Sequence, residues 1–333
     1  MLGVAIIGLG MAATPHALSL LDLSDRARVI WAATPNPVRA AAFGRAYPFA
    51  VTTNVAAAIR DPAVDCVLLL TPPATHCELA LAAFSVGKHV LVEKPLALDV
   101  ESGRVMLAAA EAAGRQLGVV LQHRFRPGPR RLRELLADGA LGAVVHAHLN
   151  VPWWRAQSYY DEPGRGTYAR DGGGVLMTQA IHSLDLLRAL VGPLHVVSAL
   201  ARTTPLHVME AEDLAAALFR LSDGGTASMV ATTASYPGTP ETLEVIGTSG
   251  TAQLVGGTLH VSLLNGFREN VASDEGTGHG AGAMDFSHHA HRALIADFLS
   301  SIALGRPPMA SGSEALDTQI LIQSILRSAR GGA

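Results

Sequence analysis

A histidine follows three consecutive glycines in the middle of the chain, on a segment whose pattern predicts a helix. Residues 171–185 read DGGGVLMTQAIHSLD, which places His182 four residues after Thr178 and three before Asp185. A continuous helix would bring these three side chains onto one face. An imidazole with an ordinary pKa near about 6.5 can accept a proton at neutral pH, so His182 is a candidate for proton transfer. Taken alone, a histidine on a buried helix face is more often structural.

A lysine follows a strand pattern much earlier in the chain, where HVLV runs into Glu93-Lys94-Pro95. Proline disfavours helical geometry at the residue before it, so Lys94 is expected in extended backbone at the carboxyl end of a strand. In a doubly wound sheet, ligands bind at that edge. A lysine there could orient a substrate hydroxyl and share its proton, although a lone lysine at a strand end is more often a surface residue.

The first strand pattern ends in a turn rich in small residues. Residues 8–13, GLGMAA, fit G-x-G-x-x-A between a strand and a helix. Gly8 permits the tight turn, Gly10 lets the backbone approach a pyrophosphate, and Ala13 lets the helix pack against the strand. The helix N-terminus would then bind the pyrophosphate through its amide groups. This context predicts a bound dinucleotide; the alternative is a turn that serves packing alone.

The residues after the second strand bear on the choice between NAD and NADP. VIWAA ends in Thr34-Pro35-Asn36, about where NAD enzymes place an acidic residue for the ribose 2′-hydroxyl. Thr34 cannot repel a 2′-phosphate, and Arg39 is close by in sequence. Thr34, Asn36 and Arg39 therefore favour NADP slightly, against the alternative that Arg39 only faces solvent.

The elements that must position these residues change character near Gln122. Up to that point, apolar strand patterns alternate with alanine-rich helical ones, which predicts a parallel sheet covered on both faces. Strands are expected at 2–7, 28–33, 66–70, 89–92 and 116–121, and helices at 11–23, 37–45, 54–60, 74–86 and 99–113.

The sequence after Gln122 predicts a second α/β domain. Strand patterns between 194 and 264 are joined by turn dipeptides such as Asp-Gly and Pro-Gly, which indicates a large, mostly antiparallel sheet. The glycine-rich segment 276–284 is predicted to be a mobile loop, and helices are expected near 286–304 and 313–329. We thus expect a dinucleotide-binding domain over 1–122 and a substrate-binding and oligomerisation domain over 123–333.

Composition excludes several classes of protein. The formal net charge of −3 over 333 residues gives no reason to expect nucleic acid, and no apolar stretch reaches the roughly 20 residues of a membrane helix. The two cysteines, Cys66 and Cys77, are read as reduced thiols, and the start of the chain shows no signal-peptide pattern, so a cytoplasmic setting is expected. We expect no metal: the histidines in SHHAHR, residues 287–292, are interpreted as a helix surface, and the arginines between 126 and 133 as a solvated face.

In combination, these motifs resemble a known family. TPPATH at 71–76, GKHVLVEKPL at 87–96, RFRP at 124–127, the GGG…H-x-x-D stretch and EDLAAALFRL at 212–221 are similar to the Gfo/Idh/MocA oxidoreductases, which include inositol dehydrogenases. The resemblance covers essentially the whole chain.

The resemblance implies both a fold and an activity. It implies an N-terminal Rossmann domain, an open sheet that often forms homodimers or homotetramers, and hydride transfer between NAD(P) and a sugar or polyol. It gives Lys94 and His182 as catalytic residues. The residues it implies at the cofactor are Gly8, Gly10, Met11, Ala13, Thr34, Asn36, Arg39, Thr71, Pro72, His76, Glu93 and Lys94.

Substrate contacts are expected from the aromatic and basic segment 152–171 and from the histidine helix. Many family members have an aspartate at the position of Thr178, and this chain departs from that pattern as some sugar-nucleotide members do. Segment 152–171 is interpreted either as a contact for an acidic or nucleotide-linked sugar or as a loop that clamps the two domains together. The expected substrate contacts are Arg124, Arg155, Tyr160, Arg165, Thr178 and Asp185, with a structural role equally open for Asp185.

Two other functions stay open. One is a redox-neutral enzyme that uses NAD transiently to cleave or epimerise a glycoside. The other is a non-catalytic NAD(P)-binding sensor, which the presence of both Lys94 and His182 disfavours.

Overall fold

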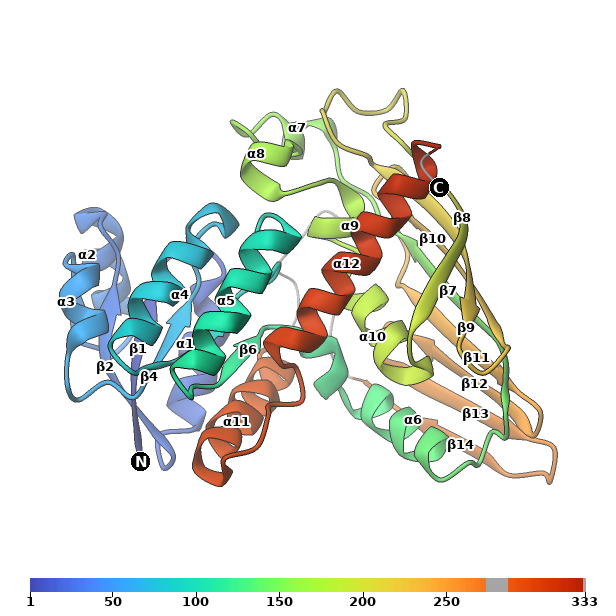
Figure 1. The fold of residues 1–333 in the computed structure, drawn as a ribbon, viewed down its shortest axis with the longest axis horizontal. Coiled ribbons are helices and arrows are strands. Elements are labelled where there is room, and N and C mark those ends of the chain that lie inside the picture. Colours follow the sequence, from blue (N-terminus) through green and yellow to red (C-terminus); the bar gives the residue numbers. More distant parts are fainter. Residues whose placement is uncertain (274–286, 332–333) are drawn as a thin grey trace. The chain divides into compact units, whose positions relative to one another are not determined.

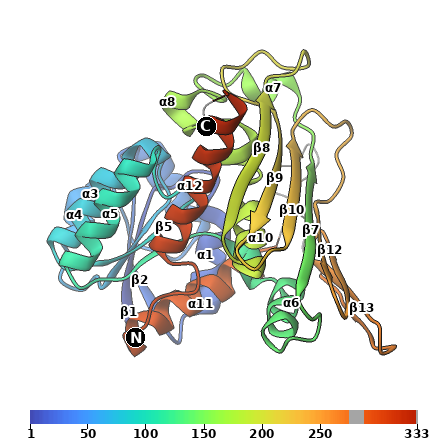
Figure 2. The same cartoon turned by 45° about the vertical axis from the view of Figure 1, so that its right-hand side comes forward.

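The computed structural model describes residues 1–273 and 287–331, which form two compact units (Figures 1 and 2). The first unit comprises Met1–Gln122 together with His288–Leu316, and the second comprises His123–Ser287 together with the chain from Asp317 onward. The predicted boundary at 122 coincides with this division. The prediction that 123–333 forms one domain is wrong for 288–316, which returns to the first unit. The predicted loop at 276–284 lies outside the described residues.

The first unit is built on a parallel sheet of six strands. Its order is β3-β2-β1-β4-β5-β6, the order of a Rossmann fold, which confirms the predicted doubly wound α/β sheet. The strands are β1 (Leu2–Ile7), β2 (Ala27–Ala33), β3 (Val51–Thr52), β4 (Cys66–Leu69), β5 (His89–Val92) and β6 (Leu117–Val119). Its helices are α1 (Ala13–Asp22), α2 (Pro37–Ala46), α3 (Val55–Arg60), α4 (His76–Ser85), α5 (Val100–Ala112) and α11 (His289–Leu304), with a 3-10 turn η1 (Pro73–Thr75).

The central strands of this sheet are apolar on both faces because helices cover both. All four residues of β4 are buried, as are Val90–Val92 of β5. The helix α11 packs against α1, which explains why a segment near the C-terminus belongs to this unit. The parallel strands place the residues after β1, β4 and β5 at one edge of the sheet, the edge at which such folds bind ligands.

The second unit contains an eight-stranded sheet in the order β14-β13-β12-β11-β7-β10-β9-β8. Among the described strands of this sheet, only β7 and β10 pair in parallel, so the predicted mostly antiparallel sheet is confirmed. The strands are β7 (Val144–Pro152), β8 (Leu194–Arg202), β9 (Leu214–Leu221), β10 (Thr226–Thr232), β11 (Thr242–Gly247), β12 (Gly250–Val255), β13 (Thr258–Leu263) and β14 (Arg268–Val271).

Helices α6 (Pro127–Ala137), α9 (Val175–Thr178) and α10 (Ile181–Val191) contact this sheet. The other helical segments are η2 (Gln122–Phe125), α7 (Gln157–Tyr160), α8 (Tyr168–Asp171) and α12 (Gly312–Ala329), of which α12 belongs to this unit from Asp317 onward. α6 contacts β12, β13 and β14, α10 contacts β7, and α9 contacts β9 and β10. Alternate residues of β9, namely Ala215, Ala217 and Phe219, are buried. The opposite face carries exposed apolar side chains, among them Leu200 and Leu218.

Among the helices of residues 1–273 and 287–331, none combines the length and apolar character needed to cross a bilayer.

The segment that carries His182 is not the continuous helix that the spacing predicts. α9 ends at Thr178, and α10 begins at Ile181. Between them the amide of Ala180 donates to the carbonyl of Val175, five residues back, which widens the turn by one residue. Thr178 and His182 therefore do not share a helix face, whereas His182 and Asp185 do, since both lie on α10.

Each of the three glycines before α9 meets a different constraint. Gly172 ends α8 in the left-handed region, with φ of 77°. Gly174 lies against the backbone of Glu212, so a Cβ there would come within 1.8 Å of the Glu212 carbonyl oxygen. A Cβ on Gly173 would meet only the flexible side chain of Met177, at 3.1 Å. The need for glycine at Gly174 thus arises from packing within the second unit.

Glu212 holds the same turn through its side chain. Its carboxylate accepts hydrogen bonds from the amides of Gly174 and Leu176, both at 3.2 Å, and its carbonyl accepts from Val175 at 2.7 Å. Burial raises the pKa of Glu212, and these hydrogen bonds oppose that rise. The close approach of Gly174 to Glu212 is what allows the carboxylate to reach both amides.

Replacing Gly174 with alanine is expected to destabilise the second unit by about 3 kcal/mol, because the methyl group must displace the Glu212 backbone. Thermal unfolding followed by circular dichroism should show a fall in Tm of roughly 5–10 °C. The matched control, Gly173→Ala, should change Tm by less than about 3 °C. Equal Tm values for the two variants would contradict this explanation of the Gly174 position.

Candidate active site

The turn after β1 has the geometry of a dinucleotide-binding turn. Gly8 adopts φ of 101°, and a Cβ there would come within 2.7 Å of the Leu70 backbone. Gly10 is exposed, and a Cβ on it would meet nothing within 4 Å. The first turn of α1 contains no acidic residue and no side-chain cap, so its amides are suited to an anion. The turn thus fits a pyrophosphate, with Met11 exposed and Ala13 buried beside it.

The end of β2 leaves Arg39 exposed in the first turn of α2. The side chain of Asn36 caps that helix by accepting hydrogen bonds from the amides of Val38 and Arg39, each at 3.0 Å. Thr34 is buried. Asn36 therefore has a structural task that the sequence motif did not indicate, while Arg39 remains accessible to a ligand.

Two further predicted cofactor residues follow β4. Thr71 is half-buried, Pro72 is exposed, and His76 is fully buried at the start of α4. The ring nitrogens of His76 lie 2.8 Å from the Thr71 carbonyl oxygen and 3.0 Å from that of Pro95. Burial lowers the pKa of His76, and its hydrogen bonds to backbone carbonyls oppose this shift. His76 thus links the two loops at the carboxyl ends of β4 and β5.

Lys94 is held at this same edge by its neighbours. Its amide donates to Oε2 of Glu93 at 3.1 Å, and the Glu93 amide donates to the Leu69 carbonyl at 2.8 Å. The other oxygen of Glu93 lies 2.8 Å from Nε2 of His16 on α1. Within the first unit, the structure therefore brings the predicted lysine to the carboxyl end of β5, on the sheet edge that also carries the glycine turn.

His182 lies near the start of α10 and is 8% exposed. Its ring stacks on that of His123, with centroids 4.9 Å apart and planes at 27°. One turn later lies Asp185, which is fully buried. Its carboxylate accepts hydrogen bonds from Nε of Arg124 at 2.6 Å and from Nη2 of Arg124 at 2.7 Å. Thr318 donates to the same carboxylate at 2.9 Å. Of the two roles open for Asp185, the geometry favours the structural one, and it assigns Arg124 to the same buried ion pair.

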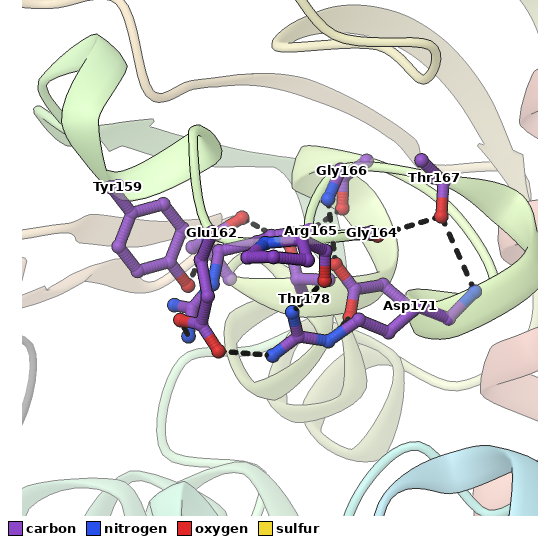
Figure 3. Close-up of polar contacts among 12 residues, drawn as sticks. Tyr159, Glu162, Gly164, Arg165, Gly166, Thr167, Asp171 and Thr178 are labelled. Carbon is purple, nitrogen blue, oxygen red and sulfur yellow. Dashed lines mark hydrogen bonds and ion pairs between the residues drawn. The ribbon is translucent and has the colours of Figure 1, made fainter.

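The aromatic and basic segment gathers Tyr159, Glu162 and Arg165 close to one another (Figure 3). The guanidinium of Arg165 lies 4.1 Å from the Tyr159 ring centroid, and that of Arg155 lies 5.6 Å from it. Arg165 also pairs with Glu162, which accepts a second hydrogen bond from Arg170 at 2.6 Å. Burial lowers the pKa of Arg155, and Arg165 acts in the same direction. The segment thus presents two guanidinium groups on one aromatic ring.

Thr178 lies beside this segment in Figure 3. Its hydroxyl contacts the Gly174 carbonyl at 2.7 Å and the side-chain oxygen of Gln179. The side-chain nitrogen of Gln179 donates in turn to the hydroxyl of Tyr159 at 3.4 Å. The widened turn between α9 and α10 therefore connects Thr178 to Tyr159.

Tyr160, which the sequence indicated as a substrate contact, points into the second unit. Its hydroxyl lies 2.7 Å from that of Thr233, and burial raises the pKa of Tyr160 to about 12. Tyr159, by contrast, is half-buried and lies against the guanidinium groups of both arginines.

A buried histidine and aspartate support this segment and were missed at the level of sequence. Nδ1 of His207 lies 2.7 Å from Asp213, and its Nε2 lies 2.8 Å from the Arg155 carbonyl. Asp213 also accepts from the amide of Thr204 at 2.7 Å and from its hydroxyl at 2.6 Å. The acidic pair that opens EDLAAALFRL was the only sequence signal for this support.

Two surface predictions are wrong. Arg126, expected on a solvated face, is 4% exposed and forms an ion pair with Glu241 at 3.1 Å. His291, expected on a helix surface, is 3% exposed. By contrast, His288 is only half-buried and lies 2.9 Å from Asp22.

Comparisons with known proteins bear on the whole chain. Residues 2–121 match the model of an oxidoreductase family with an NAD-binding Rossmann fold, and residues 130–253 match that of the GFO/IDH/MocA C-terminal domain. The chain is 27% identical to the WlbA dehydrogenase of Bordetella pertussis, solved with NADH and UDP-GlcNAcA, with a TM-score of 0.84 over 100% of this chain and 97% of that one.

Curated relatives are matched in part. A 1-carboxy-3-chloro-3,4-dihydroxycyclohexa-1,5-diene dehydrogenase of Comamonas testosteroni is 32% identical over 56% of this chain and 47% of its own length, so the chain spans about half of that relative. The scyllo-inositol 2-dehydrogenase (NAD(+)) of Bacillus subtilis is 26% identical over 78% of this chain and 76% of its length. With both family models matched in order along a Rossmann unit and an open-sheet unit, the chain belongs to the GFO/IDH/MocA oxidoreductase family.

Proposed function

We propose that the chain is an NAD(P)-dependent dehydrogenase or reductase that acts on a secondary alcohol or ketone of a sugar, sugar derivative or cyclic polyol. The observation that carries the proposal is the fixed position of Lys94, at the same edge of the sheet as the open glycine turn. The carboxyl edge of the parallel sheet then provides a binding site for the cofactor and, in Lys94, a group that can take part in proton transfer.

The proposed reaction assigns separate roles to residues that bind the cofactor and residues that transfer the proton. The amides after Gly10 would bind the pyrophosphate of a dinucleotide, which would supply the nicotinamide as hydride acceptor or donor. His182 takes the hydroxyl proton during oxidation and returns it during reduction, while Lys94 hydrogen-bonds the same oxygen and stabilises charge that develops on it. Thr178 cannot act as the base and contributes a hydrogen bond.

An acidic or nucleotide-linked sugar is the substrate class that the second unit favours. Arg155 and Arg165 present planar donors that suit carboxylate or phosphate, and Tyr159 offers an aromatic face. The WlbA relative, solved with UDP-GlcNAcA, makes a nucleotide-linked sugar acid the first compound to test.

The catalytic assignment predicts the effect of two substitutions. Lys94→Met and His182→Asn should each lower kcat by at least about 10²-fold, since each removes a group that acts on the reacting oxygen. The Kd for the cofactor, measured by fluorescence titration, should stay within about twofold. His148→Asn, on the helix-free face of the sheet, serves as the control. Near wild-type turnover in both Lys94 and His182 variants would remove the assignment.

The reaction class is tested by incubating the protein with NAD(+) or NADP(+) and a panel of sugars, inositols, sugar acids and sugar nucleotides. Net formation of reduced cofactor, followed by near-ultraviolet absorbance, is expected with at least one compound. Glycoside cleavage or epimerisation without net reduction would support the redox-neutral alternative instead. Cofactor binding without turnover on any compound would support a sensor.

The β2–α2 turn predicts a slight preference for NADP. Arg39→Ala should raise KM for NADP(+) about three- to tenfold and leave KM for NAD(+) within twofold, because only NADP carries the 2′-phosphate. Thr34→Asp should act in the same direction by adding a repelling carboxylate. Equal effects of Arg39→Ala on both cofactors would contradict the preference.

We also propose a homodimer or homotetramer through the helix-free face of the eight-stranded sheet. Leu200, Ala216 and Val230 pair across β8, β9 and β10, and Leu218 is 55% exposed on the same face. Leu218→Glu together with Leu200→Glu should reduce the mass measured by light scattering to that of one chain. A monomeric wild type, or an unchanged mass in the variant, would oppose this assembly.

A further inference from the structure

A cluster of two imidazoles and one carboxylate lies in the first unit, directly before Lys94. His16 comes from α1, Glu93 from the end of β5, and His291 from α11. The rings of His16 and His291 meet edge to face, with centroids 5.2 Å apart and planes at 81°. One nitrogen or oxygen from each residue lies within 4.8 Å of the others. Both histidines are almost fully buried, so the cluster belongs to the interior of the unit.

Glu93 uses its two oxygens for different tasks. Oε1 lies 2.8 Å from Nε2 of His16, and Oε2 accepts the amide of Lys94 at 3.1 Å. Burial acts to raise the pKa of Glu93, but the hydrogen bond from His16 and the charges of His16, His291 and Lys94 outweigh it and lower that pKa to about 2. Glu93 is therefore a carboxylate throughout the working pH range, and its orientation fixes the Lys94 backbone.

Two histidines and a carboxylate also form a familiar metal-ligand set. Here Nε2 of His16 and Oε1 of Glu93 are at hydrogen-bond distance, 2.8 Å, whereas two ligands of a tetrahedral zinc ion are about 3.3 Å apart. A metal-bound histidine normally donates its second ring nitrogen to an acceptor. Among the described residues, Nδ1 of His16 has no hydrogen-bond partner although it is buried. The geometry is that of a hydrogen-bonded carboxylate flanked by imidazoles.

We propose that His291 is a positioning residue for Lys94 and acts through Glu93. Its imidazole places a nitrogen within 4.8 Å of the Glu93 carboxylate and packs edge to face against His16, while the Glu93 side chain stays 15% exposed. This packing restricts rotation of the Glu93 side chain, so the Lys94 backbone keeps the orientation that its ammonium group needs. The inference rests on the proposed function in one respect, the role of Lys94 in turnover. It makes the returning helix α11 part of the catalytic apparatus.

The test uses variants of His291 in the full-length protein. His291→Phe keeps the ring volume but loses both nitrogens, so kcat is expected to fall on the order of 10- to 10²-fold. KM for substrate and Kd for cofactor should stay within about twofold. His291→Gln, which restores a polar nitrogen, should recover kcat to within about threefold of wild type. A fall in kcat of His291→Gln equal to that of His291→Phe, or unchanged kcat in His291→Phe, would overturn the proposal.

Two controls separate positioning from general loss of structure. Phe298→Leu changes a fully buried residue of the same helix and should lower Tm without lowering kcat below about half of wild type. His288→Ala removes the half-buried neighbour that contacts Asp22 and should leave kcat unchanged. A loss of kcat in Phe298→Leu that matches the loss in His291→Phe would show that α11 acts only through stability and would overturn the proposal.

A double-mutant cycle distinguishes failure of this inference from failure of the proposed function. In a Lys94→Met background, His291→Phe should produce no further loss of the residual turnover, because its effect passes through Lys94. If Lys94→Met retains wild-type turnover, the proposed function itself fails. If Lys94→Met is slow but His291→Phe adds a full independent loss, only the positioning role fails.

Zinc titration by calorimetry tests the metal alternative directly. The proposal expects no stoichiometric binding of Zn²⁺ that depends on His291. Stoichiometric binding with a Kd below about 1 μM that is lost in His291→Phe would overturn it in favour of a metal centre.

Discussion

The hydrogen bonds of the Glu93 carboxylate are the interaction on which the rest of the candidate site depends. One oxygen contacts His16 on the helix that begins at the cofactor turn, and the other accepts the amide of Lys94. A buried carboxylate is costly unless it is hydrogen-bonded and compensated by charge, and His16 and Lys94 supply both. The cofactor helix and the lysine are thus fixed relative to each other by one residue. His76 secures the next residue along by its contact with the Pro95 carbonyl.

The second unit uses buried acidic residues in a comparable way. Glu212 binds the amides at the start of α9, and its neighbour Asp213 holds Thr204 and His207, which contacts the Arg155 backbone. One acidic dipeptide directly before β9 therefore holds both the glycine turn before the helix of His182 and the segment that carries Arg155. The packing of Gly174 on the Glu212 backbone explains why glycine is required at that position of the turn.

Sequence patterns predict the features that depend on local geometry. Strand and helix alternation in the first 122 residues, the G-x-G-x-x-A turn and the position of Lys94 after the end of β5 all appear where they are expected, because each follows from short-range periodicity or backbone constraints. Partners distant in sequence are not predicted in this way. The pattern of 289–304 indicates a helix, but nothing in it shows that His291 faces Glu93, nearly 200 residues earlier. The spacing of Thr178 and His182 predicted that both side chains share one helix face. This prediction was wrong because the turn at Gln179 interrupts the helix. The burial of Tyr160 rather than Tyr159 was likewise not predicted, because it depends on a tertiary contact of Tyr160 with Thr233.

We propose that Glu93 fixes the lysine that acts in turnover, and the most direct test is the turnover of Glu93→Gln at saturating cofactor and substrate. The amide is nearly isosteric, but it is neutral, and one of its two positions is a donor where Glu93 accepts from both His16 and the Lys94 amide. We expect kcat to fall on the order of 10²-fold while the Kd for NAD(P) changes less than about threefold. A kcat within twofold of wild type would contradict the account.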